Sequence, residues 1–116
     1  MDNNRTLQRI NTILKHIETV ESDLKGLSLE DFEKSDLLTR ATCFSITQIG
    51  EQMIKIEDAL KEKYPDMPWK YARNMRNLIV HVYNKVKAEV IYVTATEDMQ
   101  NLKESLLKIR NDLSIN

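Results

Sequence analysis

The sequence contains few of the residues that interrupt regular secondary structure. Its 116 residues include two glycines and two prolines, and aromatic residues make up 6% of the chain. Strands joined by tight turns need more glycine and proline than this, so the counts favour helices over a sheet. The one cysteine, Cys43, excludes an internal disulfide and a cysteine-based zinc site. Because Cys43 lies in an apolar stretch, we interpret it as a small buried hydrophobic residue.

The chain also lacks an excess of charge of either sign. Its formal net charge is −1, so it has no global basic surface of the kind that drives non-specific binding to nucleic acid. The segment 61–90 differs, because it carries seven lysines and arginines against three acidic residues, a balance of +4. Any contact with RNA is therefore expected to be local.

Long apolar runs are missing as well. No run approaches the roughly 20 residues that cross a bilayer. The polar start, Met1 to Asn4, does not resemble a signal peptide. These absences predict a cytoplasmic protein with no membrane partner.

Apolar residues recur at intervals of three and four, which is the spacing of amphipathic helices. The length suits one domain, residues 1–116. We predict an all-α fold, an antiparallel four-helix up-and-down bundle with a short extra helical turn. The expected elements are a first helix ending at Leu24, a short turn over 28–34, and long helices over 36–63, 69–84 and after a break at 85–87.

Local signals refine this outline. Ser28 is predicted to cap the short helical turn, with Asp31 completing a capping box. Gly50 lies inside the second long helix, where glycine costs about 1 kcal/mol relative to alanine, so we expect a neighbouring helix to approach it closely. In the last helix, Val90 and Val93 are expected to face inward with the later apolar residues Leu102, Leu106, Ile109 and Leu113.

The third long helix has a distinct polar face. Placing its residues 100° apart gives a predicted core stripe on one side and a polar group on the other. The core stripe comprises Tyr71, Ala72, Met75, Leu78, Ile79 and Val82, and the polar group comprises Arg73, Arg76, Asn77, His81, Tyr83 and Asn84.

This polar set suits phosphodiester chemistry without a metal. Arginine binds phosphate through a planar fork and stabilises charge that develops at phosphorus. Histidine exchanges a proton near neutral pH, and RNA supplies its own nucleophile in the ribose 2′-hydroxyl. One imidazole cannot easily act as base and acid together, so the chemistry favours a homodimer with two copies of the helix face to face. A polar helix face is, however, most often simply solvated, which is how we interpret the other histidine, His16.

The helix also carries a recognisable motif. Arg76 and His81 form Arg-x4-His, and Tyr83 extends it to Arg-x4-His-x-Tyr. The chain resembles the HepT-like toxins of the HEPN superfamily in this motif. The resemblance extends over nearly the whole chain, because Ile49-Gly50-Glu51, Trp69, Phe32 and Arg40-Ala41 also match in order and spacing.

The resemblance implies a function. Such proteins are helical homodimers, and many are metal-independent endoribonucleases that need no cofactor and arrest growth. They are encoded with a nucleotidyltransferase antitoxin of the MNT type, which transfers AMP to the motif tyrosine. By match, Arg76 and His81 would be catalytic on an RNA substrate, Asn77 would support them, and Tyr83 would accept AMP.

Three positions near the motif are less determined by the resemblance. Glu51 could hydrogen-bond the motif arginine from the neighbouring helix, or it could be a surface acid. Arg73 stands where a small residue is common, so we expect it to contact substrate and alter substrate preference. Lys87 stands where the family usually has an acidic residue that could cap the last helix, and a lysine cannot accept such bonds.

Two functions other than a toxin enzyme are compatible with the sequence. Some relatives are described as nucleotidyltransferase-associated substrate-binding proteins, and the near-neutral net charge keeps that alternative open. A purely structural helical dimer is the third possibility, but it leaves unexplained why the third helix holds three asparagines, which are mediocre helix formers.

Overall fold

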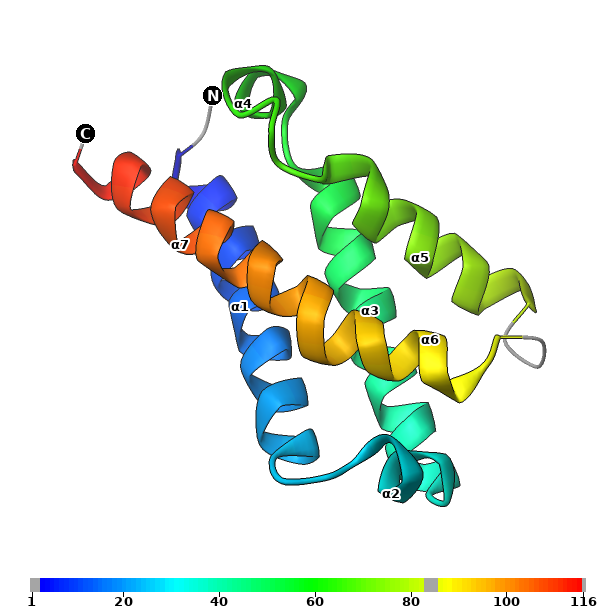
Figure 1. The fold of residues 1–116 in the computed structure, drawn as a ribbon. Coiled ribbons are helices and arrows are strands. Elements are labelled where there is room, and N and C mark those ends of the chain that lie inside the picture. The colour runs from blue at the N-terminus through cyan, green and yellow to red at the C-terminus, as the bar shows by residue number, and fades with distance from the viewer. Residues whose placement is uncertain (1–2, 83–85, 116) are drawn as a thin grey trace.

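The computed structural model describes residues 3–82 and 86–115, and for residues 81 and 82 it describes the backbone alone (Figure 1). All regular structure in the described residues is helical, so the predicted all-α class is confirmed. The elements are α1 (Asn3–Leu24), α2 (Leu29–Glu33), α3 (Asp36–Lys55), α4 (Asp58–Lys63), α5 (Trp69–Val82), α6 (Ala88–Val93), the π-helical turn η2 (Thr94–Asp98) and α7 (Met99–Ile115).

The helix α3 lies at the centre of the packing. It contacts α1 on one side and α5 on the other, and α1 also packs against α7. Figure 1 shows α6, η2 and α7 following one another as one nearly continuous rod that crosses α1. The helix α5 therefore depends chiefly on α3 for its position. The simple four-helix up-and-down arrangement stays a prediction.

The end of α1 and the start of α2 follow the local signals of the sequence. Gly26 adopts a φ of +76°, a left-handed conformation that glycine tolerates best. The Asp31 backbone N–H donates to Ser28 Oγ at 3.1 Å, and the Ser28 N–H donates to Asp31 Oδ2 at 3.0 Å. These two bonds form the predicted capping box, and they lower the pKa of the Asp31 carboxyl.

The predicted helix over 36–63 is wrong as a single element. Ile56 and Glu57 adopt extended ψ values of 139° and 141°, which end α3 at Lys55 and start α4 at Asp58. The chain thereby turns over the end of the core, where Leu60 and Met67 become buried together with Ile56. No glycine or proline marks this break in the sequence.

The inward face of the last helix also differs from the prediction at its start. Val90 and Val93 are 42% and 39% exposed, whereas Ile91 and Ala95 are buried. Counting back from Leu102 by seven and eleven residues reaches Ala95 and Ile91, which is the helical period that places residues on one face. The four later residues of the predicted stripe are buried as expected. Lys87 occupies the N-cap of α6 without a side-chain bond, as its chemistry requires.

Two buried clusters form the core. The larger joins α1, α3 and α7 around residues such as Ile13, Ile49 and Leu106, and the smaller gathers around Phe32 and Ile79. Cys43 is buried in the smaller cluster, and this burial raises the pKa of its thiol to about 11, so its interpretation as a core residue is confirmed.

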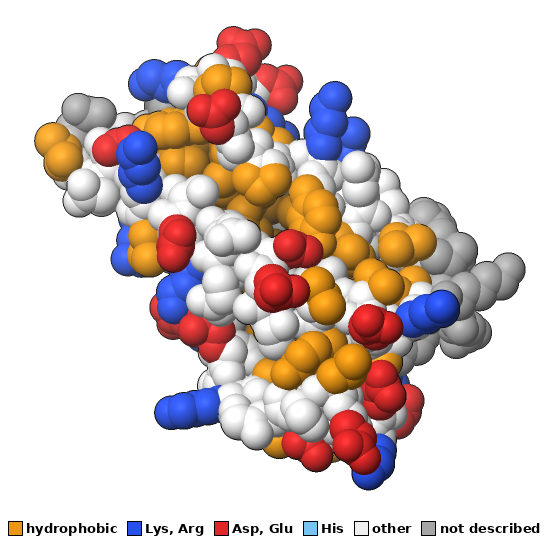
Figure 2. All heavy atoms as spheres, in the orientation of Figure 1, with side chains coloured by type: hydrophobic (Ala, Val, Ile, Leu, Met, Phe, Trp, Pro, Cys, Tyr) orange, Lys and Arg blue, Asp and Glu red, His pale blue; other side chains and the backbone are white. Residues whose placement is uncertain are grey.

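Several apolar side chains remain on the surface. Leu78 and Val80 on α5 are 41% and 54% exposed, so placing Leu78 in the core stripe was wrong. Figure 2 shows hydrophobic side chains gathered along the surface between α5 and α6. Among the described residues, no helix combines the length and apolar character needed to span a membrane.

Candidate active site

The candidate site lies where α5 packs against α3. A Cβ atom built on Gly50 would lie 2.5 Å from the Cβ of Arg76 and 2.8 Å from the backbone oxygen of Ala72. Real Cβ atoms do not tolerate such distances, so glycine allows α5 to approach α3 this closely. The packing reason that the sequence predicted for Gly50 is confirmed, and the neighbour is the helix that carries the Arg-x4-His motif.

Arg76 lies in this contact. Its Nη1 donates to Glu51 Oε1 at 2.8 Å, and the two side chains are 24% and 37% exposed. Of the two roles that the sequence left open for Glu51, the hydrogen bond to the motif arginine is present. The sequence placed Arg76 on the face opposite the core; the structure places its stem against α3, half-buried.

The guanidinium of Arg76 keeps donors for a ligand. Its Nε is buried and has no hydrogen-bond partner among the described residues. An arginine offers five N–H donors, and within the part of the chain that the structure describes, Glu51 accepts from one of them. A guanidinium held in place by one carboxylate can still bind a phosphate through its remaining donors.

The other predicted residues follow along α5. Arg73 is exposed and Asn77 is half-buried. The helix is continuous through residues 76–81, so the backbone has the i, i+4 spacing that brings positions 77 and 81 to one face. The side chain of His81 and all of Tyr83 and Asn84 lie outside the described residues.

Tyr71 forms a tie that sequence reasoning missed. It was predicted as a core residue, but its hydroxyl donates to the carboxylate of Asp98 and lies 3.2 Å from Thr94 Oγ1. Burial and the bond to Asp98 raise the pKa of Tyr71 to about 12. The tie links α5 to η2, and the only signal for it in the sequence is the i, i+4 spacing of Thr94 and Asp98.

The family comparison decides the assignment. The family described as Ribonuclease HepT-like matches residues 13–109. The chain belongs to this family. The resemblance that the motif indicated is thereby confirmed, and with it the prediction of a ribonuclease as the enzyme class.

Individual relatives agree with the family. A protein named "Putative RNase" from Caldanaerobacter subterraneus subsp. tengcongensis is 33% identical over 97 residues, which cover 84% of this chain and 87% of the relative. The protein named "Probable ribonuclease HepT" from Thermococcus cleftensis is 30% identical over 102 residues, covering 84% of this chain and 89% of the relative. No solved structure shows significant similarity to the chain.

Proposed function

We propose that the chain is the toxin of a toxin–antitoxin pair and cleaves RNA without a metal through Arg76 and His81. The observation that carries the proposal is the contact between α3 and α5. There, Gly50 brings the motif helix close and Glu51 holds the motif arginine at 2.8 Å. This contact would fix the phosphate-binding group relative to the rest of the motif.

The proposed reaction is an internal transfer at phosphorus. His81 removes the proton of the ribose 2′-hydroxyl, and the 2′-oxygen forms a bond to the adjacent phosphorus. The bond from phosphorus to the 5′-oxygen breaks, and that oxygen takes a proton from an imidazolium. The products are a 2′,3′-cyclic phosphate and a 5′-hydroxyl. Arg76 stabilises the negative charge that develops on the phosphoryl oxygens, and Asn77 supports the arrangement.

A homodimer would supply the second imidazole. Two copies of α5 face to face would place two Arg-x4-His motifs in one composite cleft, one histidine acting as base and the other as acid. Leu78 and Val80 lie within the motif, and their apolar side chains are exposed. This supports a dimer in which a second copy covers that surface. In the same proposal, residues 1–116 form one domain built as a four-helix up-and-down bundle that acts in the cytoplasm.

Tyr83 is the proposed site of silencing. An antitoxin of the MNT nucleotidyltransferase type would transfer AMP from ATP to its hydroxyl: the tyrosine oxygen loses its proton and bonds to the α-phosphorus of ATP, and pyrophosphate leaves. The added phosphate would occupy Arg76 and repel a second polyanion. A mass increase of one or more AMP units on Tyr83, in the presence of the partner enzyme and ATP, is the expected result. Modification at another residue would contradict this part of the proposal.

The alternative is a nucleotide- or substrate-binding protein that serves a partner enzyme and does not cut RNA. The net charge of −1 favours it, because a nuclease usually needs positive charge to hold its substrate. A growth assay separates the two functions. Expression of the unmodified chain alone should arrest growth and expression of His81→Ala should not. If the chain with His81 intact leaves growth unchanged, the binding function becomes the better account.

A further inference from the structure

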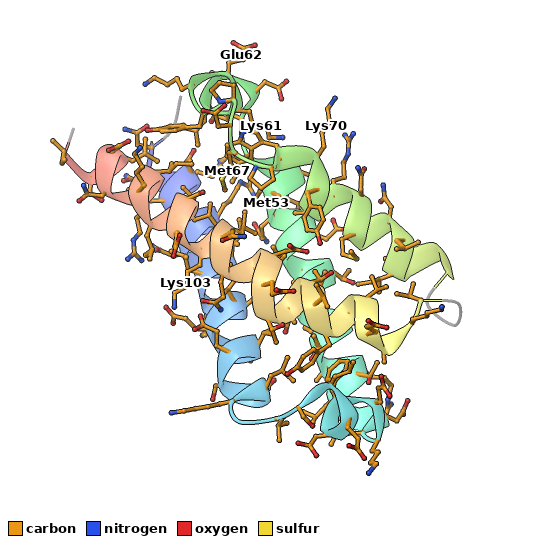
Figure 3. The ribbon with its side chains drawn as sticks, viewed as in Figure 1. Met53, Lys61, Glu62, Met67, Lys70 and Lys103 are labelled. Carbon is orange, nitrogen blue, oxygen red and sulfur yellow. The ribbon has the colours of Figure 1, made fainter. Side chains whose placement is uncertain are left out.

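A second basic site lies beside the candidate active site. A cavity of about 400 Å³ is lined by Lys61 of α4 and by Lys70 and Arg73 of α5, with Asp58 as the one acidic group in the lining. Ile54 and Trp69 complete the walls. Figure 3 shows Lys61 and Lys70 at the same end of the molecule, with Glu62 pointing away from α4.

The positive charge in this cavity is poorly compensated. Within the described residues, no ion pair is formed by Lys70 or Arg73, and Lys61 donates through Nζ to the backbone oxygen of Ile54 at 3.3 Å. Three cations and one carboxylate leave an excess of positive charge, and the like charges repel one another. A bound anion would relieve that repulsion, and it would also meet the positive end of the α5 dipole.

The cavity lies one helical turn from the contact that holds Arg76. Ile54 lies four residues after Gly50 on α3, and Arg73 lies three residues before Arg76 on α5. Three and six residues of helix place Arg73 and Lys70 about 4.5 Å and 9 Å from Arg76 along the axis. An extended RNA strand with one phosphate bound at Arg76 could therefore place a neighbouring phosphate at this cavity.

The wall of the cavity offers a surface for a base. Trp69 donates from its indole Nε1 to the backbone oxygen of Tyr64 at 2.9 Å, which fixes the orientation of the ring. The indole is only partly buried, and it lines the cavity beside the lysines. A basic groove with an aromatic ring is the combination that binds single-stranded nucleic acid without sequence preference.

We propose that this cavity binds the RNA strand next to the cleavage site, with Lys61, Lys70 and Arg73 each contacting a backbone phosphate and Trp69 stacking on a base. The inference rests on the proposed ribonuclease function and adds to it the class of substrate, which is an unpaired strand that extends beyond the cleaved phosphate. The subsite accounts for how a chain with no net basic charge holds RNA.

The test compares two double variants. In Lys61→Gln/Lys70→Gln two charges leave the cavity. In the control Lys25→Gln/Lys34→Gln two exposed charges leave the opposite end of the molecule, next to α2 (Figure 1). Binding to a fluorescent single-stranded oligoribonucleotide is measured against salt for both pairs in a His81→Ala background, which removes cleavage.

Each lost phosphate contact should lower the slope of log affinity against log salt by about 0.7, which is roughly fivefold in affinity at 0.1 M salt. The cavity variant should thus bind roughly 25-fold more weakly. The control pair should bind like the parent. The single variant Lys70→Gln changes an exposed position, where substitutions have little effect on stability, and its affinity should fall about fivefold.

Cleavage by the proteins with His81 intact separates this inference from the proposed function. The cavity variant should raise KM for a long strand, leave kcat unchanged, and cleave a dinucleotide at the parental rate. If the parent cleaves RNA and the cavity variant matches the control in slope and KM, the subsite is wrong and the nuclease stands. If the parent binds RNA without cutting it and the cavity variant binds more weakly, the subsite stands and the nuclease is wrong. Free AMP could instead bind tightly, with an affinity that does not depend on salt and without displacement by oligoribonucleotides of any length. That result would overturn the subsite.

Discussion

Replacing Gly50 with alanine should displace the motif helix. The new Cβ would meet Arg76 Cβ at 2.5 Å and the Ala72 backbone oxygen at 2.8 Å. Because the second atom belongs to the backbone of α5, a change of side-chain conformation cannot relieve the contact. Reaching ordinary separation requires α5 to move by about 1 Å, a shift whose cost lies in the range for overpacked cores, roughly 1–3 kcal/mol.

The expected loss of stability is too small to account for the expected loss of activity. Overpacking against backbone should lower the free energy of unfolding by about 3 kcal/mol, and the better helix propensity of alanine should raise it by about 1 kcal/mol. The net loss is therefore about 2 kcal/mol. That change lowers Tm by roughly 8 °C in a chain of this size. A displacement of about 1 Å at a reacting group costs roughly 100-fold in rate, far more than the fraction unfolded explains.

Gly26→Ala provides the matched control. Its Cβ would meet nothing within 4 Å, but the φ of +76° makes alanine strained by about 1–2 kcal/mol. Urea denaturation and RNA cleavage should show two variants of similar stability, of which only Gly50→Ala loses roughly 100-fold in cleavage rate. Equal activity of the two variants, or a Gly50→Ala protein as stable and active as the parent, would refute the reasoning.

Three further changes test the contacts around the motif. Glu51→Gln should cost less than about 1 kcal/mol in denaturation, because the pair is partly exposed, yet lower kcat/KM about tenfold; unchanged or faster cleavage would contradict a positioning role. Tyr71→Phe should lower the free energy of unfolding by about 1–3 kcal/mol, because Asp98 loses its hydrogen-bond donor. In the parent, the contribution of Tyr71 to stability should persist up to the ordinary tyrosine pKa of 10.0 and disappear as pH rises through about 12. Ser28→Ala should cost about 1 kcal/mol. The contribution of Asp31, whose pKa is lowered, should be full above 3.8 and fade as pH falls further, and a loss of stability between pH 5 and 7 at this cap would contradict that assignment.

The sequence predicted the elements whose signals are local. The capping box at Ser28 depends on residues three apart, and the motif helix depends on a clear apolar period, so both were predictable. The break at Ile56 was not, because Ile56 and Leu60 fit a continuous helical stripe as well as they fit a turn. Only the packing of α4 over the core decides between the two.

The contacts of the site depend on relations between helices. Glu51 meets Arg76 because Gly50 sets the separation of α3 and α5, and a single amino-acid sequence does not give that distance. The Tyr71–Asp98 bond depends likewise on how η2 presents its side chains to α5. The roles of Asn77, His81 and Tyr83 were expected from the motif, and that of Arg73 from its departure from the family pattern. These roles remain predictions, which activity measurements will decide.

The most direct test of the central claim is RNA cleavage by the purified protein in the presence of a metal chelator. His81→Ala is compared with His16→Ala, which removes the other histidine of the chain, on α1. We predict that the parent and His16→Ala leave 2′,3′-cyclic phosphate ends on the cleaved RNA and that His81→Ala leaves the RNA intact. Full cleavage by His81→Ala would contradict the assignment of the motif as the active site.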